Sequence, residues 1–305
     1  MKDLADSIYI PIKERYENAI DTGFNDIDNH IKGLKQQEIT ILFGRNGEGK
    51  STFASQLLAY HISKGNRAYL YSGELGESKI QEWLYKQIIG YDEKFYNKVM
   101  TKYDNQLEIK HTVLTTLKEW HRHRLFIYNM KLDKIQDDTE ILFEDMNNAL
   151  TCGVTLFLID NLMTAYTINE RTQYSDQANF VQDCKDFARD NNVHIIIICH
   201  PNKSQQELPI DAKVGNLAKN DVSGSGNISN KADNVISIER IWKEKNVNYE
   251  DEYYDALVTV LKEREGGERA TYGYWFGKKS LRFYNGKTSI EANIDWQGKG
   301  NQSKL

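Results

Sequence analysis

The sequence has little proline and little cysteine, with three of each among 305 residues. So few prolines exclude a proline-rich or collagen-like chain. Cys152, Cys184 and Cys199 are an odd number without paired spacing, so we expect neither a disulfide framework nor a zinc site. No apolar run approaches the roughly 18 residues that span a membrane, and the first residues are acidic where a targeting peptide would be basic and then apolar. We therefore expect a cytoplasmic protein.

The chain also lacks a surplus of basic side chains, because 44 acidic residues against 39 basic ones leave a net charge of −5. This balance argues against a protein that coats nucleic acid through bulk charge, but it permits a few basic loops directed at one strand. With 40% hydrophobic and 27% charged residues, the composition is that of a globular protein. The length suits one large α/β domain or two smaller domains.

Short apolar segments alternate with helical segments through the first two thirds of the chain. We expect strands at 39–43, 67–71, 125–128, 154–159 and 194–199, and helices at 50–64, 78–89, 138–150 and 177–189. This alternation predicts an α/β fold with a mostly parallel sheet and helices on both faces.

The pattern changes after His200. Residues 201–227 are polar, and the following strand-like runs at 234–238, 257–261, 272–276 and 281–284 lack helices between them. They predict an antiparallel extension of the sheet at the C-terminal end. We divide the chain into a helix-like linker or docking segment at 1–20, a single domain at 21–290 and a polar tail at 291–305.

The segment from Gly44 to Ser51 matches the phosphate-binding pattern G-x-x-x-x-G-K-[ST], with a strand before it and an amphipathic helix after it. In such a loop, backbone N–H groups surround phosphate oxygens, the lysine reaches the β- and γ-phosphates, and the serine ligates Mg²⁺. We therefore expect a nucleotide and Mg²⁺ as cofactors. The predicted nucleotide-binding residues are Gly44, Asn46, Gly47, Glu48, Gly49, Lys50, Ser51 and Thr52.

Three further polar residues follow strands that end at the same edge as the phosphate loop. Asp160 ends an apolar strand, where a second Mg²⁺ ligand beside Ser51 would lie. Glu74 follows the strand at 67–71 and is the candidate base that orients the attacking water. His200 ends the next core strand and is the candidate contact to the γ-phosphate. Cys199 and His200 are adjacent and could form a nucleophilic pair, but we favour a buried cysteine at the end of a core strand, because free cysteines are usually buried.

Besides the phosphate loop, six motifs in order resemble the ATPase domain of the DnaB-type replicative helicases of superfamily 4, which have a RecA-like fold. The resemblance runs from about residue 22 to 283 and is nearer to the phage primase-helicase and Twinkle branch than to bacterial DnaB. It rests on the phosphate loop and on five other segments: Thr22-Gly23-Phe24 with Gly33-Leu34, Tyr71-Ser72-Gly73-Glu74, Ile159-Asp160-Asn161-Leu162, Ile198-Cys199-His200, and Gly224-Ser225-Gly226 followed by Ala232-Asp233-Asn234. The segment Leu261-Lys262-Glu263-Arg264, followed by Gly266-Gly267, resembles the part that reaches into a neighbouring subunit.

The resemblance implies roles for residues that the composition alone does not single out. Arg264 would be an arginine finger acting in a neighbouring subunit, assisted by Lys262. Arg240 and Phe276 would hold the nucleotide base, with Trp275 and Phe283 as competing aromatic residues. The family implies ATP and Mg²⁺ as cofactors and a homo-hexameric ring that moves 5′→3′ on single-stranded DNA during replication in a bacterial or phage-infected cell. The sequence shows no primase, zinc ribbon or DnaB-type N-terminal helical domain, so we expect either a standalone helicase or a piece of a longer protein, and a primase or other replication proteins could be partners.

The polar stretch after His200 is the candidate DNA-binding segment. The candidate contacts are Asn202, Lys203, Lys213, Lys219, Gly224, Ser225 and Gly226, which offer cations and backbone N–H groups to phosphates. Each lysine could equally be a solvated surface charge. Two other functions remain open at this point: a RecA- or KaiC-like ATPase that assembles without unwinding DNA, and a P-loop kinase of small molecules.

Overall fold

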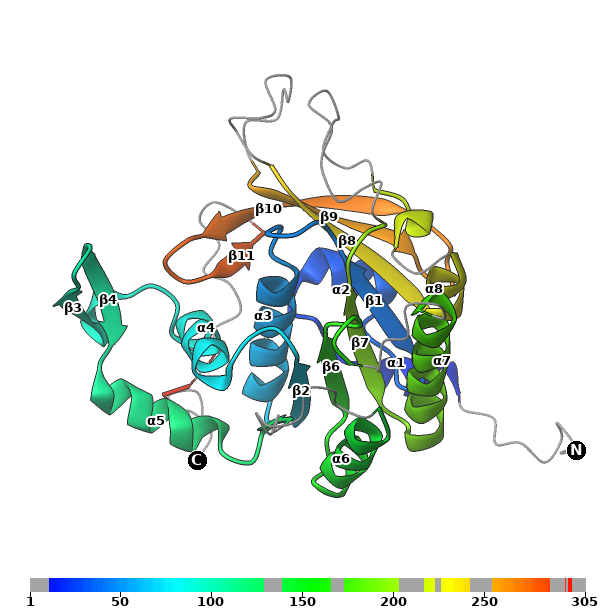
Figure 1. Ribbon diagram of the computed structural model, residues 1–305, viewed down its shortest axis with the longest axis horizontal. Helices are drawn as coiled ribbons and strands as arrows, with labels where there is room; N and C mark the ends of the chain where they lie inside the picture. The colour runs from blue at the N-terminus through cyan, green and yellow to red at the C-terminus, as the bar shows by residue number, and fades with distance from the viewer. Residues whose placement is uncertain are drawn as a thin grey trace, which may run out of the picture.

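The computed structural model describes residues 11–128, 139–165, 173–202, 217–222, 226–241, 254–285, 294 and 296–297. Nine strands form one sheet in the order β11-β10-β9-β8-β1-β7-β6-β2-β5 (Figure 1). Their bounds are β1 Ile39–Phe43, β2 Ala68–Ser72, β5 Leu125–Ile127, β6 Leu156–Asp160, β7 His194–Cys199, β8 Asn234–Arg240, β9 Ala256–Lys262, β10 Ala270–Gly277 and β11 Arg282–Tyr284. The pairs among β8, β1, β7, β6, β2 and β5 are parallel, whereas β9, β10 and β11 extend the sheet antiparallel. Both predicted features of the sheet are confirmed.

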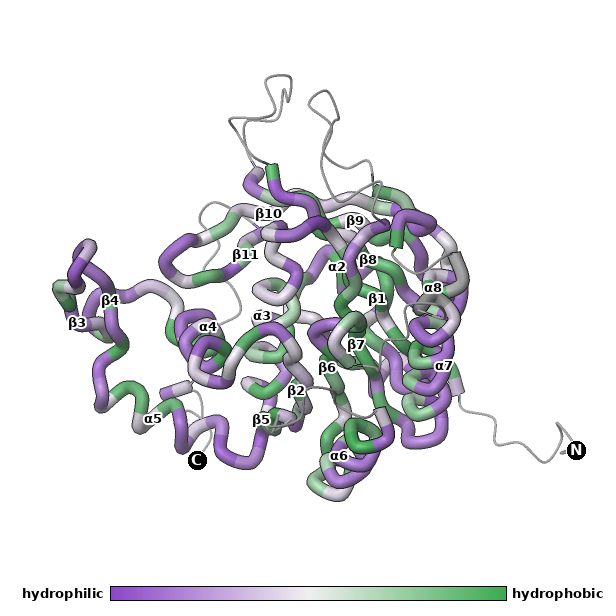
Figure 2. The backbone as a smooth tube through the Cα atoms, in the orientation of Figure 1, coloured by the Kyte–Doolittle hydropathy of each residue, from purple (hydrophilic) through white to green (hydrophobic). Residues whose placement is uncertain are grey.

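Helices cover the two faces of this sheet as the alternating pattern predicts. The helices are α1 Ile12–Glu17, α2 Asn25–Ile31, α3 Lys50–Ser63, α4 Glu77–Ile89, α5 His111–His121, α6 Thr139–Thr151, α7 Gln173–Asn191 and α8 Gly226–Lys231. Alternate residues of the central strands pack on α6 and α7 on one face, and on α2 and α3 on the other. The tube in Figure 2 is accordingly apolar along β1, β6 and β7.

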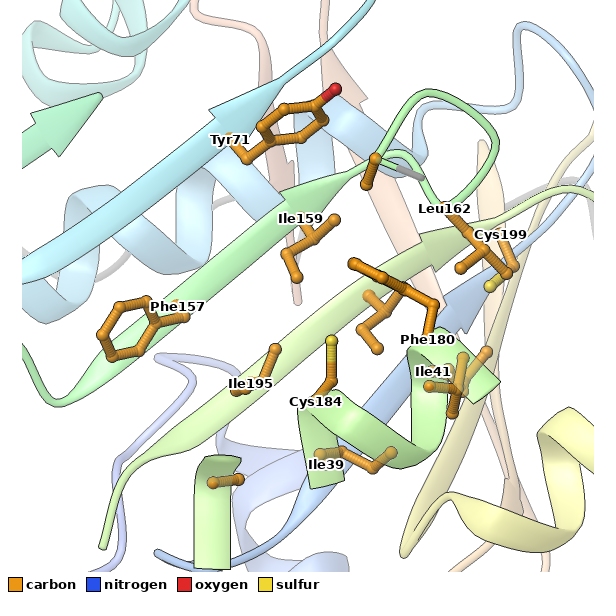
Figure 3. Close-up of a cluster of buried hydrophobic side chains, with 14 of the residues drawn as sticks. Ile39, Ile41, Tyr71, Phe157, Ile159, Leu162, Phe180, Cys184, Ile195 and Cys199 are labelled. Atoms are coloured by element: carbon orange, nitrogen blue, oxygen red, sulfur yellow. The ribbon is translucent and has the colours of Figure 1, made fainter. Parts of the chain in front are cut away.

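Figure 3 shows the cluster between the sheet and α7, where Cys184 and Cys199 are buried beside Ile41 and Phe180. Burial raises the pKa of the Cys199 thiol to about 12, so the thiol is protonated near neutral pH. The nucleophilic pairing of Cys199 with His200 is therefore wrong, since the thiolate is the reactive form. Among the described residues, no helix is long and apolar enough to cross a membrane.

Two parts of the structure differ from the sequence-based expectations. Between α4 and β5 lies a hairpin of β3 Tyr96–Met100 and β4 Asn105–Ile109, which pairs outside the main sheet (Figure 1). Ile294 and Trp296, within the predicted polar tail, are each only 8% exposed and pack with α4, α5 and the hairpin. The segment is polar on average, but these two apolar side chains belong to the folded domain.

Candidate active site at the carboxyl edge of the sheet

The phosphate loop connects the end of β1 to the start of α3 and relies on its glycines. Gly47 and Gly49 have φ of 77° and 92°, and Gly49 is the N-cap of α3. A Cβ on Gly44 would come within 2.3 Å of the carbonyl oxygen of Ile238, so a side chain is excluded there. Asn46 and Gly47 are exposed at the top of the loop. The loop thus presents backbone and the first turn of α3 at the carboxyl edge, as an anion site requires.

Lys50 is 6% exposed, and the loop itself holds its ammonium group. The Nζ atom donates to the carbonyl oxygens of Gly44 at 2.8 Å and Arg45 at 3.0 Å. Burial lowers the pKa of Lys50, while the nearby carboxylates of Asp160, Glu48 and Glu74 oppose that shift. A buried cation among carbonyl oxygens and carboxylates is poised to meet an incoming phosphate group.

Beneath the loop lies a buried ion cluster that the sequence pattern does not reveal. The Nη1 atom of Arg45 is 3.1 Å from Oε2 of Glu239 and 3.7 Å from Oε1 of Glu48, and all three residues are buried. Glu48 also accepts a hydrogen bond from the backbone N–H of Arg45 at 3.1 Å. Burial raises the pKa of Glu48 to about 7. Glu48 was predicted to bind nucleotide, but its side chain supports the loop from below, so only its backbone could face a phosphate.

Asp160 and Ser51 meet where the ends of β6 and α3 approach each other. Asp160 is 5% exposed and accepts a hydrogen bond from the Ser51 side chain. Burial raises the pKa of Asp160 to about 6, with Glu74 adding to the shift and Ser51 and Lys50 opposing it. A buried carboxylate beside a hydroxyl is an all-oxygen donor set, which fits Mg²⁺. A divalent cation there would also stabilise the charged carboxylate that burial disfavours.

Glu74 and His200 are brought together by a residue that was not predicted to have a role, Asn161. The amide nitrogen of Asn161 donates to Oε1 of Glu74 and lies 3.1 Å from Nε2 of His200. Nε2 of His200 is 3.5 Å from the same oxygen of Glu74. Burial, and then the positive charge of Lys50, lower the pKa of His200, whereas Glu74 raises it. The sequence signal for Asn161 was available, since it directly follows Asp160 at the same sheet edge.

Arg240 and Phe276 lie close together, as their predicted shared role requires. The guanidinium carbon of Arg240 is 4.5 Å from the centroid of the Phe276 ring. Of the competing aromatic residues, Phe283 is fully buried under Gly49, and Trp275 packs on Tyr254 at 4.7 Å between ring centroids. Phe276 is therefore the aromatic partner of Arg240, and base binding by the pair stays a prediction.

Arg264 and Lys262 lie at the opposite edge of the sheet from the phosphate loop of the same chain. Lys262 pairs with Val235 of β8, and Val235 pairs in turn with Ile41 of β1. Arg264 forms an ion pair with Asp233. Asp233 also accepts a hydrogen bond from the backbone N–H of Ile39, at the start of β1. At about 3.3 Å per residue, the five residues from Ile39 to Gly44 place Arg264 roughly 16 Å from its own phosphate loop. Arg264 could take part in hydrolysis only at a site on another copy.

Both cations are held by their own chain at this edge. Lys262 donates to the carbonyl oxygens of Ser229 and Asn230 at 3.0 Å and of Ala232 at 2.6 Å, at the end of α8. The side chain of Arg264 remains 60% exposed beside Asp233. Arg264 is therefore placed to reach outward, whereas Lys262 chiefly neutralises the end of α8.

Two of the predicted DNA contacts lie together beyond β7. Asn202 donates its side-chain amide to the carbonyl oxygen of Asn220 at 3.0 Å and its backbone N–H to that of Asp221 at 2.7 Å. The exposed Lys219 begins the short 3-10 helix that contains these acceptors. Gly226 begins α8. Lys203, Lys213, Gly224 and Ser225 lie outside the described residues.

Comparison with known proteins gives a consistent result. The family described as "DnaB-like helicase C terminal domain" matches residues 19–285. A "Probable replicative DNA helicase" from Trieres chinensis is 20% identical over 289 residues, covering 93% of this chain and 62% of the relative. The chain thus spans less than two thirds of that relative's length.

Solved structures share the fold at low sequence identity. A DnaB-like replicative helicase, described with its interactions with primase, has a TM-score of 0.70 at 16% identity, covering 87% of this chain and 63% of that one. A second structure, described as an ATPase domain, has a TM-score of 0.67 at 18% identity, covering 88% and 92%. A KaiC-like protein from Pyrococcus horikoshii OT3 has a TM-score of 0.57 at 15% identity, covering 87% and 97%. The RecA-like fold is confirmed, and it is shared by helicases and KaiC-like ATPases.

Proposed function

Because this chain belongs to the DnaB-like helicase C-terminal domain family, we propose that it is the ATP-driven motor of a ring-shaped DNA helicase. The observation that carries the proposal is the match of that family over residues 19–285, which contain every predicted catalytic residue. The ring would be a homo-hexamer that moves 5′→3′ on single-stranded DNA in replication, with a primase or other replication proteins as partners. Membership of the phage and Twinkle branch is part of this proposal.

The geometry supports a division of labour in ATP hydrolysis. Ser51 and Asp160 would hold Mg²⁺, which neutralises charge on the β- and γ-phosphates when bound. The backbone N–H groups of the loop and Lys50 bind the phosphates, and Glu74 accepts a proton from the attacking water. Arg264 of a neighbouring copy stabilises the charge on the transferred phosphoryl group. His200 contacts the γ-phosphate. The presence or loss of that phosphate therefore changes the position of Asn202, which lies two residues further along the chain.

The decisive assay for unwinding uses a forked duplex with one labelled strand. We expect the purified protein with ATP and Mg²⁺ to displace that strand, and to require a 5′ single-stranded arm. A RecA- or KaiC-like ATPase, the alternative that has the same fold, would hydrolyse ATP and assemble without displacing the strand. ATP hydrolysis without strand displacement on any forked duplex would therefore contradict the helicase proposal and favour that alternative.

The role of Glu74 is tested by Glu74→Gln, which keeps the size of the side chain but removes its basicity. We expect ATP binding to be retained and turnover to fall on the order of 100-fold, the usual contribution of a general base. Nucleotide binding by calorimetry and phosphate release measure the two effects. Glu77→Gln, an exposed residue at the start of α4, is the matched control. Turnover within twofold of wild type in Glu74→Gln would remove Glu74 from this role.

The predicted DNA loop is tested by changing Lys203, Lys213 and Lys219 together to alanine. We expect weaker binding of single-stranded DNA and a shallower dependence on salt, since each lost phosphate contact lowers the logarithmic slope by about 0.7. The control carries the same charge change on the exposed residues Lys98, Lys102 and Lys118 of the hairpin and α5. Equal weakening in both variants would show that only bulk charge matters, and would contradict the predicted loop.

A further inference from the structure

The side chain of Asn161 is a feature of the site to which neither the motif pattern nor the phosphate loop gives a task. Asn161 is 1% exposed and lies between two candidate catalytic residues, which follow the strands on either side of β6. Its amide nitrogen reaches Oε1 of Glu74 and lies 3.1 Å from Nε2 of His200. Its two N–H groups therefore match two partners, one on each side.

The amide is held in place from behind by the turn that follows β6. Oδ1 of Asn161 accepts the backbone N–H of Met163 at 2.9 Å, and the Asn161 carbonyl accepts the Thr164 hydroxyl at 3.0 Å. The turn is anchored to β7 through the N–H of Leu162, which donates to Ile198 at 2.9 Å, and to β2 through the Tyr71 hydroxyl. Because Oδ1 faces an N–H donor, the nitrogen must be the atom that faces Glu74 and His200.

This orientation fixes the proton on the imidazole ring of His200. An amide N–H directed at Nε2 requires that Nε2 be an acceptor, so the proton of the neutral ring lies on Nδ1. Nothing at Nδ1 competes, since that atom is buried and has no hydrogen-bond partner among the described residues. Burial and the nearby Lys50 lower the pKa of His200, which keeps the ring neutral.

We propose that Asn161 is a positioning residue that holds Glu74 and His200 in one hydrogen-bonded unit. One amide hydrogen fixes Oε1 of Glu74 and leaves Oε2 to accept the proton of water, while the other fixes the tautomer of His200. A movement of His200 at the phosphate is thereby transmitted to Glu74 through the amide of Asn161, beside the 3.5 Å approach of Nε2 to Oε1. The catalytic consequence rests on the proposed ATPase function, whereas the hydrogen-bond arrangement does not.

The first test reads the tautomer of His200 by NMR in protein labelled with ¹³C,¹⁵N-histidine, assigned with His200→Gln. We expect the Nδ1–H form in the wild type. In Asn161→Ala we expect the Nε2–H form, because Nε2 would then face only the Glu74 oxygen, 3.5 Å away. An Nε2–H tautomer in the wild type, or no change in Asn161→Ala, would overturn the inference. This readout needs no turnover, so it is separate from any failure of the ATPase proposal.

The second test separates positioning from folding by kinetics. In Asn161→Ala we expect kcat to fall about 10-fold with KM for ATP within twofold, since the residue acts on the base and not on phosphate binding. Asn161→Asp keeps the shape but puts a carboxylate against Glu74, and kcat should fall further. Tyr71→Phe removes a hydrogen bond to the same turn and should leave kcat within twofold. Equal losses in Tyr71→Phe and Asn161→Ala would show that only the turn matters, and would refute positioning.

Discussion

Replacing Arg264 with alanine should lower DNA-stimulated ATP hydrolysis on the order of 10³-fold while leaving nucleotide binding almost unchanged. The reason is the placement of this side chain, which lies roughly 16 Å from its own phosphate loop by strand register. A cation at that distance cannot stabilise the phosphoryl group of its own site, so any effect on hydrolysis must come from a site on a neighbour. An arginine supplied in trans typically contributes about 10³ to 10⁵ in kcat.

Mixing the Arg264→Ala and Lys50→Ala proteins distinguishes this account from simple misfolding. Each variant alone should be inactive, but in mixed rings about a quarter of the boundaries combine an intact phosphate loop with an intact Arg264. Partial recovery of hydrolysis is therefore expected on mixing. Arg269→Ala, which changes an exposed arginine whose guanidinium reaches the carbonyl oxygen of Leu217 at 3.4 Å, is the matched control on the same segment. No recovery in mixtures that still assemble would show that Arg264 does not act in trans.

Replacing Lys50 with alanine should abolish ATP hydrolysis, with a loss on the order of 10³-fold or more. The ammonium group is buried and donates hydrogen bonds to the carbonyl oxygens of Gly44 and Arg45. Its positive charge also offsets the negative charge of the nearby carboxylates of Asp160 and Glu48. Without the ammonium group, the carbonyl oxygens and carboxylates would repel the negatively charged phosphates of ATP. Phosphate release and calorimetric titration with ATP measure the effect, and circular dichroism checks the fold. Hydrolysis within tenfold of wild type would contradict the assignment of the phosphate loop.

The control for this variant is Lys64→Ala at the end of the same helix. Lys64 is exposed, and its Nζ atom lies over the ring of Tyr60 at 4.6 Å from the centroid, far from the loop. The substitution removes one positive charge from the end of α3 without touching the site. We expect normal hydrolysis in Lys64→Ala, so that a loss specific to Lys50→Ala reports on phosphate binding and not on the charge of the helix.

The sequence predicts the parts of this site that depend on local pattern. Consecutive apolar residues such as those of β1 and β6 are typical of strands covered on both faces. The glycines before Lys50 are typical of a phosphate-binding loop. Once those strands are placed in one parallel sheet, Asp160, Glu74 and His200 must lie at its carboxyl edge. Their proximity is a consequence of topology, and the structure places them accordingly.

Other features could not be predicted because they depend on contacts between segments far apart in the chain. The Arg45 cluster joins the loop to Glu239, nearly two hundred residues later, so Glu48 looked like a phosphate ligand. The β3–β4 hairpin has two strands of five residues each, which are too short and too polar to be distinguished from a loop by their sequence pattern. Trp296 was assigned to a polar tail because its partner Phe95 is remote in sequence.

The acidic balance of the chain becomes understandable once the cations are located. Lys50 donates to carbonyl oxygens of the phosphate loop, and Lys262 donates to carbonyl oxygens at the end of α8. Arg45 forms ion pairs with buried carboxylates. The net charge of −5 is a sum over the whole chain, so it does not report how cations are distributed between the site and the outer surface. In a ring, a few loop cations per copy would suffice to hold one strand in the channel.

The central claim, that each ATP site is completed by a second copy, is tested most directly by measuring the mass of the assembly. The sample is the full chain with a non-hydrolysable ATP analogue, Mg²⁺ and a single-stranded oligonucleotide, weighed by mass photometry and imaged as single particles. The account predicts a closed or lock-washer ring of six copies, with Arg264 of each copy facing the phosphate loop of the next. A protein that stays monomeric under these conditions and still hydrolyses ATP at the DNA-stimulated rate would contradict it.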